Sequence, residues 1–196
     1  MKIWLASSNK GKRKEFENLL ADLPVELHGP EELSYYTSPE ENGDTFIANA
    51  RIKAKYLAAS VNEGWVLADD SGLECEGLNN MPGIHSARYA GDKASDAENV
   101  AKLLKMIKLR TNNRKARFVC ALVAIDPNGQ EYVFEGELKG SIASKQMGTG
   151  GFGYDPIFIP DNHEQSLAEM TSAEKNRLSH RANALKLFKE ELRKHL

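Results

Sequence analysis

Apolar residues recur along the chain at two periods, one typical of strands and the other of amphipathic helices. Short apolar runs predict strands at 2–6, 65–68, 118–125 and 157–159, with shorter strand patterns at 25–28 and 131–137. Stripes at helical spacing predict four helices, around Phe16, Leu19, Leu20 and Leu23; Ile47, Ala50, Ala54 and Leu57; Val100, Leu103, Leu104 and Ile107; and Leu185, Phe188 and Leu192. This mixture indicates a layered α/β domain with helices on both sides of a sheet.

Turn and capping residues predict where these elements begin and end. The first helix is expected to end before Pro24, and the second to be capped by Asp44. Capping boxes at Ser95–Glu98 and Thr171–Glu174 predict two further helix starts, and Ser179 is expected to cap the last helix. A turn at 126–129 predicts a hairpin, which excludes a purely parallel sheet.

Composition changes this picture little. The 196 residues suit a single domain spanning 1–196, with 41% apolar and 28% charged residues. The net charge of -2 argues against a basic nucleic-acid binder, so an anion site must be built locally. The two cysteines lack metal-ligand spacing, and no apolar stretch is long enough for a membrane span or a signal peptide. A cytoplasmic protein is expected.

The segment Ser7-Ser8-Asn9-Lys10-Gly11-Lys12 joins the first strand to the first helix. Helix N-termini favour anions because their N–H groups and dipole point outward, and Gly11 lets the backbone approach a ligand. The segment is not a Walker A loop. It therefore reads either as a phosphate cradle or as a solvated basic helix start.

Asp69 and Asp70 are expected at the end of the strand at 65–68. Alternation along a strand would turn one carboxylate toward a ligand crevice, and such oxygens suit Mg²⁺. The other reading is a turn in which an aspartate caps the backbone near Gly72. Glu40 or Glu41 is available as a second metal ligand.

The segment Gly148–Pro156 contains too many glycines for a strand. Phe152 and Tyr154 within it would either stack on a base or fold back into the core. Lys175, His180 and Arg181 gather around a helix start, and His180 is the histidine best placed for function. Two isolated cations are further candidates, Arg88 and Lys53, the latter because it interrupts an apolar helix face.

Taken together, these segments resemble the inosine/xanthosine triphosphate pyrophosphatase family. The motifs run in order along nearly the whole chain: Ser7-x-Asn9-x-x-Lys12-x-x-Glu15, Glu41-x-Gly43-x-Thr45-Phe46 with Asn49-Ala50-x-x-Lys53-Ala54, Ala68-Asp69-Asp70-Ser71-Gly72-Leu73, Pro82-Gly83-Ile84-x-Ser86-Ala87-Arg88-Tyr89, Gly148 to Pro156, and Ser179-His180-Arg181. Six motifs in order make the resemblance specific.

The resemblance implies a fold, an activity and a set of site residues. The fold would be an elongated mixed sheet flanked by helices, with two lobes, an active-site cleft between them, and a homodimer. The activity would be Mg²⁺-dependent hydrolysis of dITP, ITP and XTP to monophosphate and pyrophosphate, with no nucleic-acid or membrane partner. The implied metal ligands are Asp70 and Glu41, the catalytic residues Asp70, Asp69 and Lys53, and the substrate-binding residues Ser7, Ser8, Asn9, Lys10, Gly11, Lys12, Ser71, Phe152, Gly153, Tyr154, Asp155, Lys175, His180 and Arg181.

The expected mechanism is metal-assisted hydrolysis with Asp70 orienting or deprotonating water, and Asp69 sharing that role as an open alternative. Arg13 and Lys14 are expected to remain solvated charges. Donors such as Lys175 and Arg181 would pair with the keto oxygen at purine position 6, where adenine carries an amino group. The competing readings are a nucleotide-binding regulatory module, an RNA-binding domain and a pyrimidine-directed Maf-type pyrophosphatase.

Overall fold

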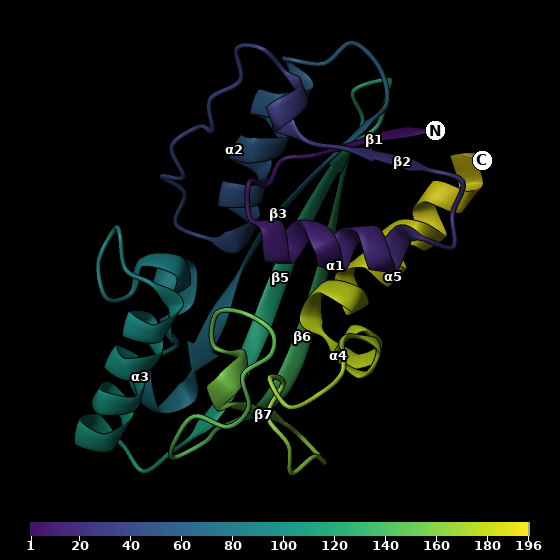
Figure 1. The fold of residues 1–196 in the computed structure, drawn as a ribbon. Helices are drawn as coiled ribbons and strands as arrows, with labels where there is room; N and C mark the ends of the chain where they lie inside the picture. The colour runs from purple at the N-terminus through teal and green to yellow at the C-terminus, as the bar shows by residue number, and fades with distance from the viewer. Residues whose placement is uncertain (196) are drawn as a thin grey trace. The chain divides into compact units, whose positions relative to one another are not determined.

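The computed structural model describes residues 1–195 as a mixed α/β protein (Figure 1). The strands are β1 Lys2–Leu5, β2 Glu26–His28, β3 Trp65–Cys75, β4 Met81–Pro82, β5 Lys115–Ile125, β6 Glu131–Ile142 and β7 Phe158–Pro160. The helices are α1 Lys10–Leu20, α2 Phe46–Ala58, α3 Asp96–Arg110, α4 Ser172–Leu178 and α5 His180–Leu192, with five short 3₁₀ turns. No helix within 1–195 is both long and apolar enough to cross a membrane.

The strands form one mixed sheet in the order β2-β1-β3-β5-β6-β7, with β4 paired to β3. The strand β1 pairs in parallel with both β2 and β3, whereas β3–β4 and β6–β7 are antiparallel. At the β5–β6 turn, Gly129 N–H donates to the Asp126 carbonyl at 3.0 Å, as the turn signal predicts. The expected mixed sheet flanked by helices is therefore confirmed.

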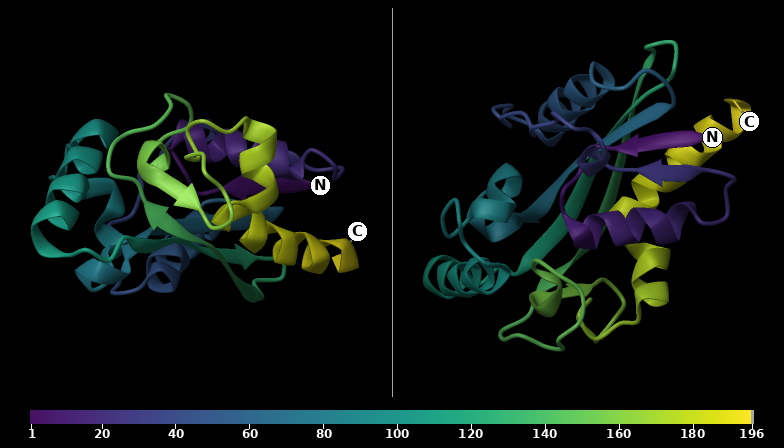
Figure 2. Two further views of the ribbon diagram at one scale, coloured as in Figure 1. Left: turned by 90° about the horizontal axis from the view of Figure 1, so that it is seen from below. Right: turned by 45° about the horizontal axis from the view of Figure 1, so that its top comes forward.

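The chain divides into two compact units. Unit 1 comprises 1–70, 120–136 and 182–196, and unit 2 comprises 71–119 and 137–181. Both chain ends belong to unit 1, where β1 and the end of α5 lie on the same side (Figures 1 and 2).

Unit 1 buries both faces of its strands, and successive residues point to opposite faces. Ile3 and Leu5 of β1 pack on the side of α1 and α5, together with Phe16, Phe188 and nine further buried residues. Ala6 and Val66 pack on the other side, against the Ala50, Ala54 and Leu57 stripe of α2. This period-two burial is why the apolar runs in these strands are continuous.

Unit 2 has its own core, built around α3 and the glycine-dense segment. Leu103 and Ile107 of α3 are at most 1% exposed and cluster with Leu73, Phe158 and nine other buried residues. Cys75 is also in this core, where burial raises the pKa of its thiol to about 12. A thiol protonated at neutral pH is a poor nucleophile, in keeping with a structural role.

Both capping boxes form as predicted. Ser95 Oγ accepts from Glu98 N–H at 3.3 Å, and a carboxylate oxygen of Glu98 accepts from Ser95 N–H at 2.7 Å. The same reciprocal pair joins Thr171 and Glu174 at the start of α4. The prediction for α2 is wrong by one residue, because Thr45 rather than Asp44 is the cap, accepting from Ala48 N–H at 3.1 Å.

The strand at 65–68 is longer than predicted. It continues through Asp69, Asp70, Ser71 and Gly72 to Cys75, so the two aspartates lie within β3 rather than at its end. Locally these four residues favour a turn. Lys12 of α1 pairs with Asp69, and the side-chain amide of Asn49 in α2 donates to Asp70. Because the two carboxylates have these partners, the strand does not have to end at Asp69.

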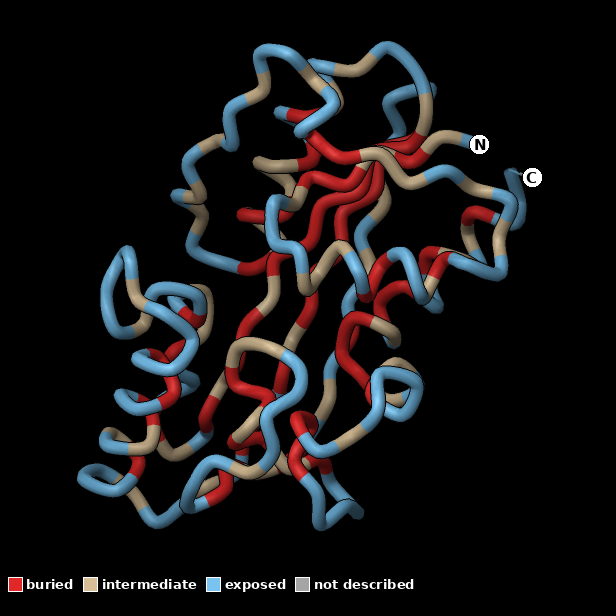
Figure 3. Tube along the Cα trace, in the orientation of Figure 1, coloured by how far each residue is buried: buried red, intermediate tan, exposed pale blue. Residues whose placement is uncertain are grey.

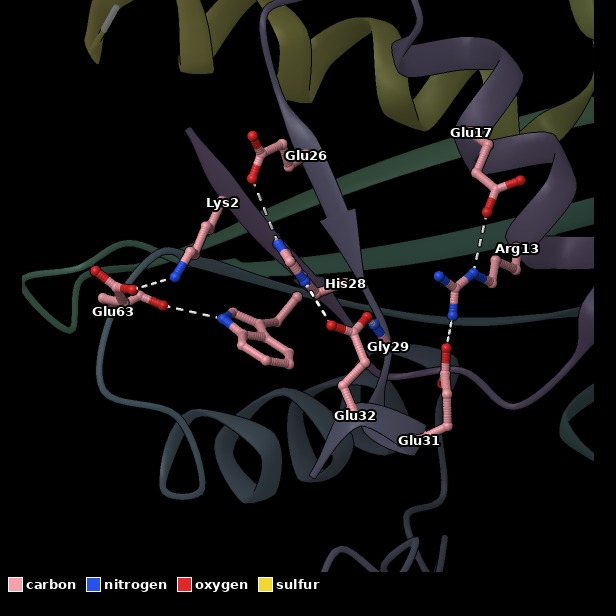
Figure 4. A network of polar contacts seen from close by, with 10 residues as sticks. Lys2, Arg13, Glu17, Glu26, His28, Gly29, Glu31, Glu32 and Glu63 are labelled. Carbon is pink, nitrogen blue, oxygen red and sulfur yellow. Dashed lines mark hydrogen bonds and ion pairs between the residues drawn. The ribbon is translucent and has the colours of Figure 1, made fainter. Parts of the chain in front are cut away.

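A polar network joins β1, β2 and the first turn of α1 at the edge of unit 1 (Figure 4). Glu32 accepts from His28 Nδ1 at 2.7 Å and from Gly29 N–H at 3.0 Å, while the His28 ring lies 5.0 Å from the Trp4 ring. Arg13 pairs with Glu17 at 3.0 Å and also with Glu31. Arg13, expected to be a solvated charge, is half-buried and pairs at the surface with Glu17 of its own helix and with Glu31 of the next segment, both exposed.

Burial separates the strands from the connection between β2 and α2. Figure 3 shows buried residues along the strands, whereas residues 31–45 are exposed or half-buried throughout. Glu41 lies in this connection and is half-buried. The connection is held to α2 by the Glu41–Lys53 pair at 3.2 Å and by packing of the Tyr36 ring on Tyr56, and to α1 by the Glu31–Arg13 pair.

Candidate functional site

The start of α1 contributes the first part of the candidate site in unit 1. Asn9 is the N-cap, and its Oδ1 accepts from Lys12 N–H at 3.0 Å. The amides of Lys10 and Gly11 precede the first intrahelical bond, in which Arg13 N–H donates to the Asn9 carbonyl. Ser7 Oγ accepts from Asn9 N–H at 3.3 Å, which shapes the loop that leads into the helix.

Asp69 is paired with the cation of that helix start. Its Oδ2 lies 2.9 Å from Lys12 Nζ, and its side chain is only 1% exposed. The pair holds α1 against β3, because breaking a buried ion pair leaves an uncompensated charge. One cation of the predicted phosphate cradle thus already has an acid partner.

Asp70 lies in a different environment, among side chains of α2. Asn49 Nδ2 donates to its Oδ2 at 3.1 Å, and Lys53 Nζ lies 3.9 Å from its Oδ1. Burial raises the pKa of the Asp70 carboxyl, Lys53 and Lys12 oppose that rise, and Glu41 adds to it. A carboxylate with a raised pKa is better suited to accept a proton than an ordinary aspartate.

Lys53 lies near the carboxylates of both Asp70 and Glu41. Its Nζ donates to the Asp69 backbone carbonyl at 2.6 Å and lies 3.2 Å from Glu41 Oε2. Two carboxylates from distant parts of the sequence, Asp70 and Glu41, therefore lie within 4 Å of the same nitrogen. Of the candidate metal ligands, Glu41 rather than the exposed Glu40 has this geometry.

The donor set fits a magnesium ion. Mg²⁺ binds through one or two carboxylates and completes its shell with water and substrate phosphates. Among residues 1–195 no cluster of three or more acidic, histidine or cysteine side chains could hold a metal alone. A pair of carboxylates from Asp70 and Glu41 matches this mode of binding, in which the substrate supplies further ligands.

Unit 2 contains the second group of predicted residues, around the Phe152 ring. Lys175 Nζ lies 4.5 Å and Arg181 Cζ 5.9 Å from the ring centroid, and Lys175 pairs with Asp155 at 2.6 Å. Asp155 also accepts from Phe152 N–H at 2.9 Å. The loop, the aromatic ring and the two cations thus form one connected group.

Contacts with β3 and β5 hold Arg181 and His180 in place. Arg181 is 2% exposed, and its Nη2 donates to Ser71 Oγ at 3.1 Å. The His180 ring stacks on Phe118, with centroids 4.8 Å apart and planes 12° apart. Ser71 and Arg181 therefore lie together with Phe152 of the glycine-dense segment within unit 2, whereas His180 packs on Phe118 of β5.

The two aromatic residues of the glycine-dense segment differ. Tyr154 is 5% exposed, its hydroxyl donates to the Ser86 carbonyl at 2.7 Å, and burial raises the pKa of its phenol. Its ring thus folds into the core, the second of the two alternatives. Phe152 is half-buried and is the aromatic side chain better placed to meet a base.

Three residues that organise these groups had no predicted role. They are Asn49, which binds Asp70; Asp96, whose Oδ2 accepts from Gly153 N–H at 2.7 Å; and Phe118, which stacks on His180. Asn49 had a detectable signal, because it is a polar residue on the buried face of α2 beside Ala50. The partners of Asp96 and Phe118 are distant in sequence and leave no local signal.

Comparison with known proteins gives concordant results. A model described as the Ham1 family matches residues 3–191. The chain is 55% identical over 194 residues to a dITP/XTP pyrophosphatase of Bdellovibrio bacteriovorus, covering 98% of both chains, and 43% identical over 183 residues to one of Bacillus subtilis, covering 93% and 92%. Among solved structures, a HAM1 protein from Coxiella burnetii superposes with a TM-score of 0.90 at 38% identity, covering 99% of each chain.

Proposed function

Because the chain belongs to the Ham1 family, we propose that it hydrolyses non-standard purine nucleoside triphosphates (dITP, ITP and XTP) to the monophosphate and pyrophosphate. Relatives that bear the name dITP/XTP pyrophosphatase support this substrate class. The observation that carries the proposal is the convergence of Asp70 and Glu41 on Lys53, with the Lys12–Asp69 pair in the same unit. A regulatory module that only binds nucleotides has no need of this acidic cluster.

In this proposal the residues of unit 1 bind the phosphates and prepare the attacking water. The amides and hydroxyls of Ser7 to Gly11 surround the triphosphate, with Lys10 adding positive charge. Asp70, a buried carboxylate held by Asn49, accepts the proton of the water. Magnesium held by Asp70 and Glu41 would supply charge neutralisation for the phosphate oxygens.

The proposed role of unit 2 is base recognition. Lys175 and Arg181 carry only donors, which pair with the keto oxygen at position 6 of hypoxanthine or xanthine. Adenine places an amino donor there, so donors would face donors and go unpaired. Phe152, lying against both cations, offers an aromatic face on which the base stacks.

Product analysis tests the reaction. The protein is incubated with dITP and Mg²⁺, and the products are separated by anion-exchange chromatography. The expected products are dIMP and pyrophosphate in equal amounts, with dATP turned over at least about a thousandfold more slowly because its amino group leaves buried donors unpaired. Formation of dIDP and orthophosphate would contradict the proposal.

The same assay separates the remaining alternatives. Preference for dTTP or UTP over dITP would favour a pyrimidine-directed pyrophosphatase, and binding without turnover would favour a regulatory module. Removal of Mg²⁺ with a chelator is expected to abolish hydrolysis, with recovery on re-addition. The proposal also includes assembly as a homodimer, a cytoplasmic location and a role in removing non-standard nucleotides from the nucleotide pool. Light scattering after size-exclusion chromatography tests the dimer.

A further inference from the structure

Asn49 joins the two segments that carry the proposed metal ligands. It lies in the first turns of α2, is 1% exposed, and uses both ends of its carboxamide. Its Oδ1 accepts from Gly43 N–H at 2.8 Å, and its Nδ2 donates to Asp70 Oδ2 at 3.1 Å. One side chain thus connects the backbone two residues after Glu41 with the carboxylate of Asp70.

Close packing makes this connection rigid. A Cβ on Gly43 would lie 2.7 Å from Ala48 Cβ and 2.8 Å from Asn49 Oδ1, so only glycine lets the backbone lie this near to α2. Four residues after Asn49, on the same face of the helix, Lys53 contacts Glu41 and the Asp69 carbonyl. The position of Glu41 relative to Asp70 is therefore set through α2.

A second buried asparagine shows what a purely structural role looks like. Asn99 of α3 is 2% exposed, and its Oδ1 accepts from Ala90 N–H at 2.8 Å. Its Nδ2 donates to the Ala87 carbonyl at 3.1 Å, so both of its partners are backbone groups. Asn49 differs in that its donor binds a carboxylate proposed to hold the metal.

We propose that Asn49 is a positioning residue that orients the Asp70 carboxylate and holds it at a fixed distance from Glu41, so that the two together bind a divalent cation. The inference rests on the proposed function. Only a carboxamide of this length both accepts from Gly43 and donates to Asp70, because aspartate has no donor and leucine has neither group. Outer residues that orient metal ligands typically change metal affinity or activity by about 10–100-fold.

The test measures Mg²⁺ binding to the full chain by isothermal titration calorimetry, and separately the Mg²⁺ concentration that gives half-maximal dITP hydrolysis. Asn49→Ala is expected to weaken Mg²⁺ binding by at least about tenfold and to raise the half-maximal Mg²⁺ concentration by a similar factor. Asn99→Ala, which also removes a buried carboxamide, is expected to leave both quantities within about twofold of wild type.

Thermal unfolding of each variant distinguishes lost positioning from lost folding. If Asn49→Ala does not fold, Asn49→Ser replaces it, because a serine hydroxyl is too short to reach both Gly43 and Asp70. Mg²⁺ binding by a folded Asn49 variant within twofold of wild type overturns the inference, as does an equal loss in Asn99→Ala.

If the proposed function fails, the measurements differ from those expected when only the role of Asn49 is wrong. Wild-type protein that binds Mg²⁺ but does not hydrolyse dITP contradicts the activity, and the calorimetric comparison of Asn49→Ala with Asn99→Ala still decides the role of Asn49. Wild-type protein that binds no Mg²⁺ at millimolar concentration and whose dITP hydrolysis does not depend on Mg²⁺ contradicts both the ligand pair and the inference.

Discussion

At the scale of single residues, two adjacent aspartates in one strand have different roles because their partners differ. Asp69 is tied to Lys12, whereas Asp70 contacts Asn49 and lies near Lys53 and Glu41. Neighbouring residues of a strand point to opposite faces, so each meets a different helix. The two carboxylates should therefore respond differently to the same substitution.

We expect Asp70→Asn to lower kcat for dITP at least about a hundredfold, because it removes the proposed base and a metal ligand. Asp69→Asn instead leaves Lys12 without its buried partner, so the free energy of unfolding should fall by about 3 kcal/mol. Steady-state kinetics and urea unfolding of both variants check these expectations. A hundredfold loss of kcat in Asp69→Asn at unchanged stability would instead assign the base to Asp69.

Gly151 allows a separate test at the base-binding group. It has φ of +70°, and an added Cβ would clash with the Asp155 carboxylate that binds Phe152 N–H and Lys175. Gly151→Ala is therefore expected to raise KM for dITP about tenfold or more, by displacing the group that Asp155 organises.

Gly129→Ala is the matched control. Gly129 also has a left-handed φ of +84°, but nothing lies within 4 Å of the added Cβ. It shares the backbone strain, so stability should fall in both variants while KM rises only in Gly151→Ala. An equal change of KM in both would show that strain, and not Asp155, is responsible.

At the scale of elements, the starts of α3 and α4 were predictable because capping chemistry is local. Ser95 and Glu98 are three residues apart and satisfy each other's backbone N–H groups whatever the rest of the chain does. The pKa of the Glu98 carboxyl is lowered by hydrogen bonds from the Ser95 backbone and side chain. This box therefore makes the stability of α3 depend on pH.

The lowered pKa of Glu98 determines whether stability rises or falls with pH. Glu98 contributes stability above its ordinary value of 4.5, and the contribution is lost as the pH falls through the lower pKa of the folded state. Glu98→Gln keeps the acceptor but not the charge, so it should melt below wild type at pH 7, and the difference should shrink as the pH falls toward 3. Melting curves from pH 7 to 3 measure this difference, and a difference that does not change with pH would contradict the expectation.

At the scale of the whole molecule, unit 1 is assembled from three separate stretches of chain. Its last stretch is α5, whose Leu185, Phe188 and Leu192 pack against β1 and α1. Lys189 of α5 donates to the Leu19 carbonyl at 2.9 Å and pairs with Asp22. The final helix thus completes a core that begins at the first strand.

A chain ending at Arg181 keeps every proposed site residue but is expected to lose cooperative unfolding. Deleting one buried phenylalanine side chain costs about 3–5 kcal/mol, and α5 contributes four buried apolar residues to the core of unit 1. A chain ending at Leu192 keeps this packing and is the control. Differential scanning calorimetry of both checks this, and a cooperative transition in the shorter chain would contradict it.

The sequence alone determined the features that arise within a few residues. The helices α1, α3 and α5, both capping boxes, the β5–β6 turn and the buried strands follow from apolar period, capping pairs and turn residues. The ordered motifs also led to the family, which the comparisons confirmed. These features depend on local backbone geometry and need no knowledge of distant partners.

Tertiary structure alone decided which distant groups meet. Asp69 and Asp70 remain within β3 because Lys12, Asn49 and Lys53, some 16 to 57 residues away, satisfy them. Tyr154 turns inward because the Ser86 carbonyl, 68 residues away, accepts its hydroxyl. Such pairings depend on sheet register and helix packing, which determine the cost of burying a polar group and which local patterns do not encode.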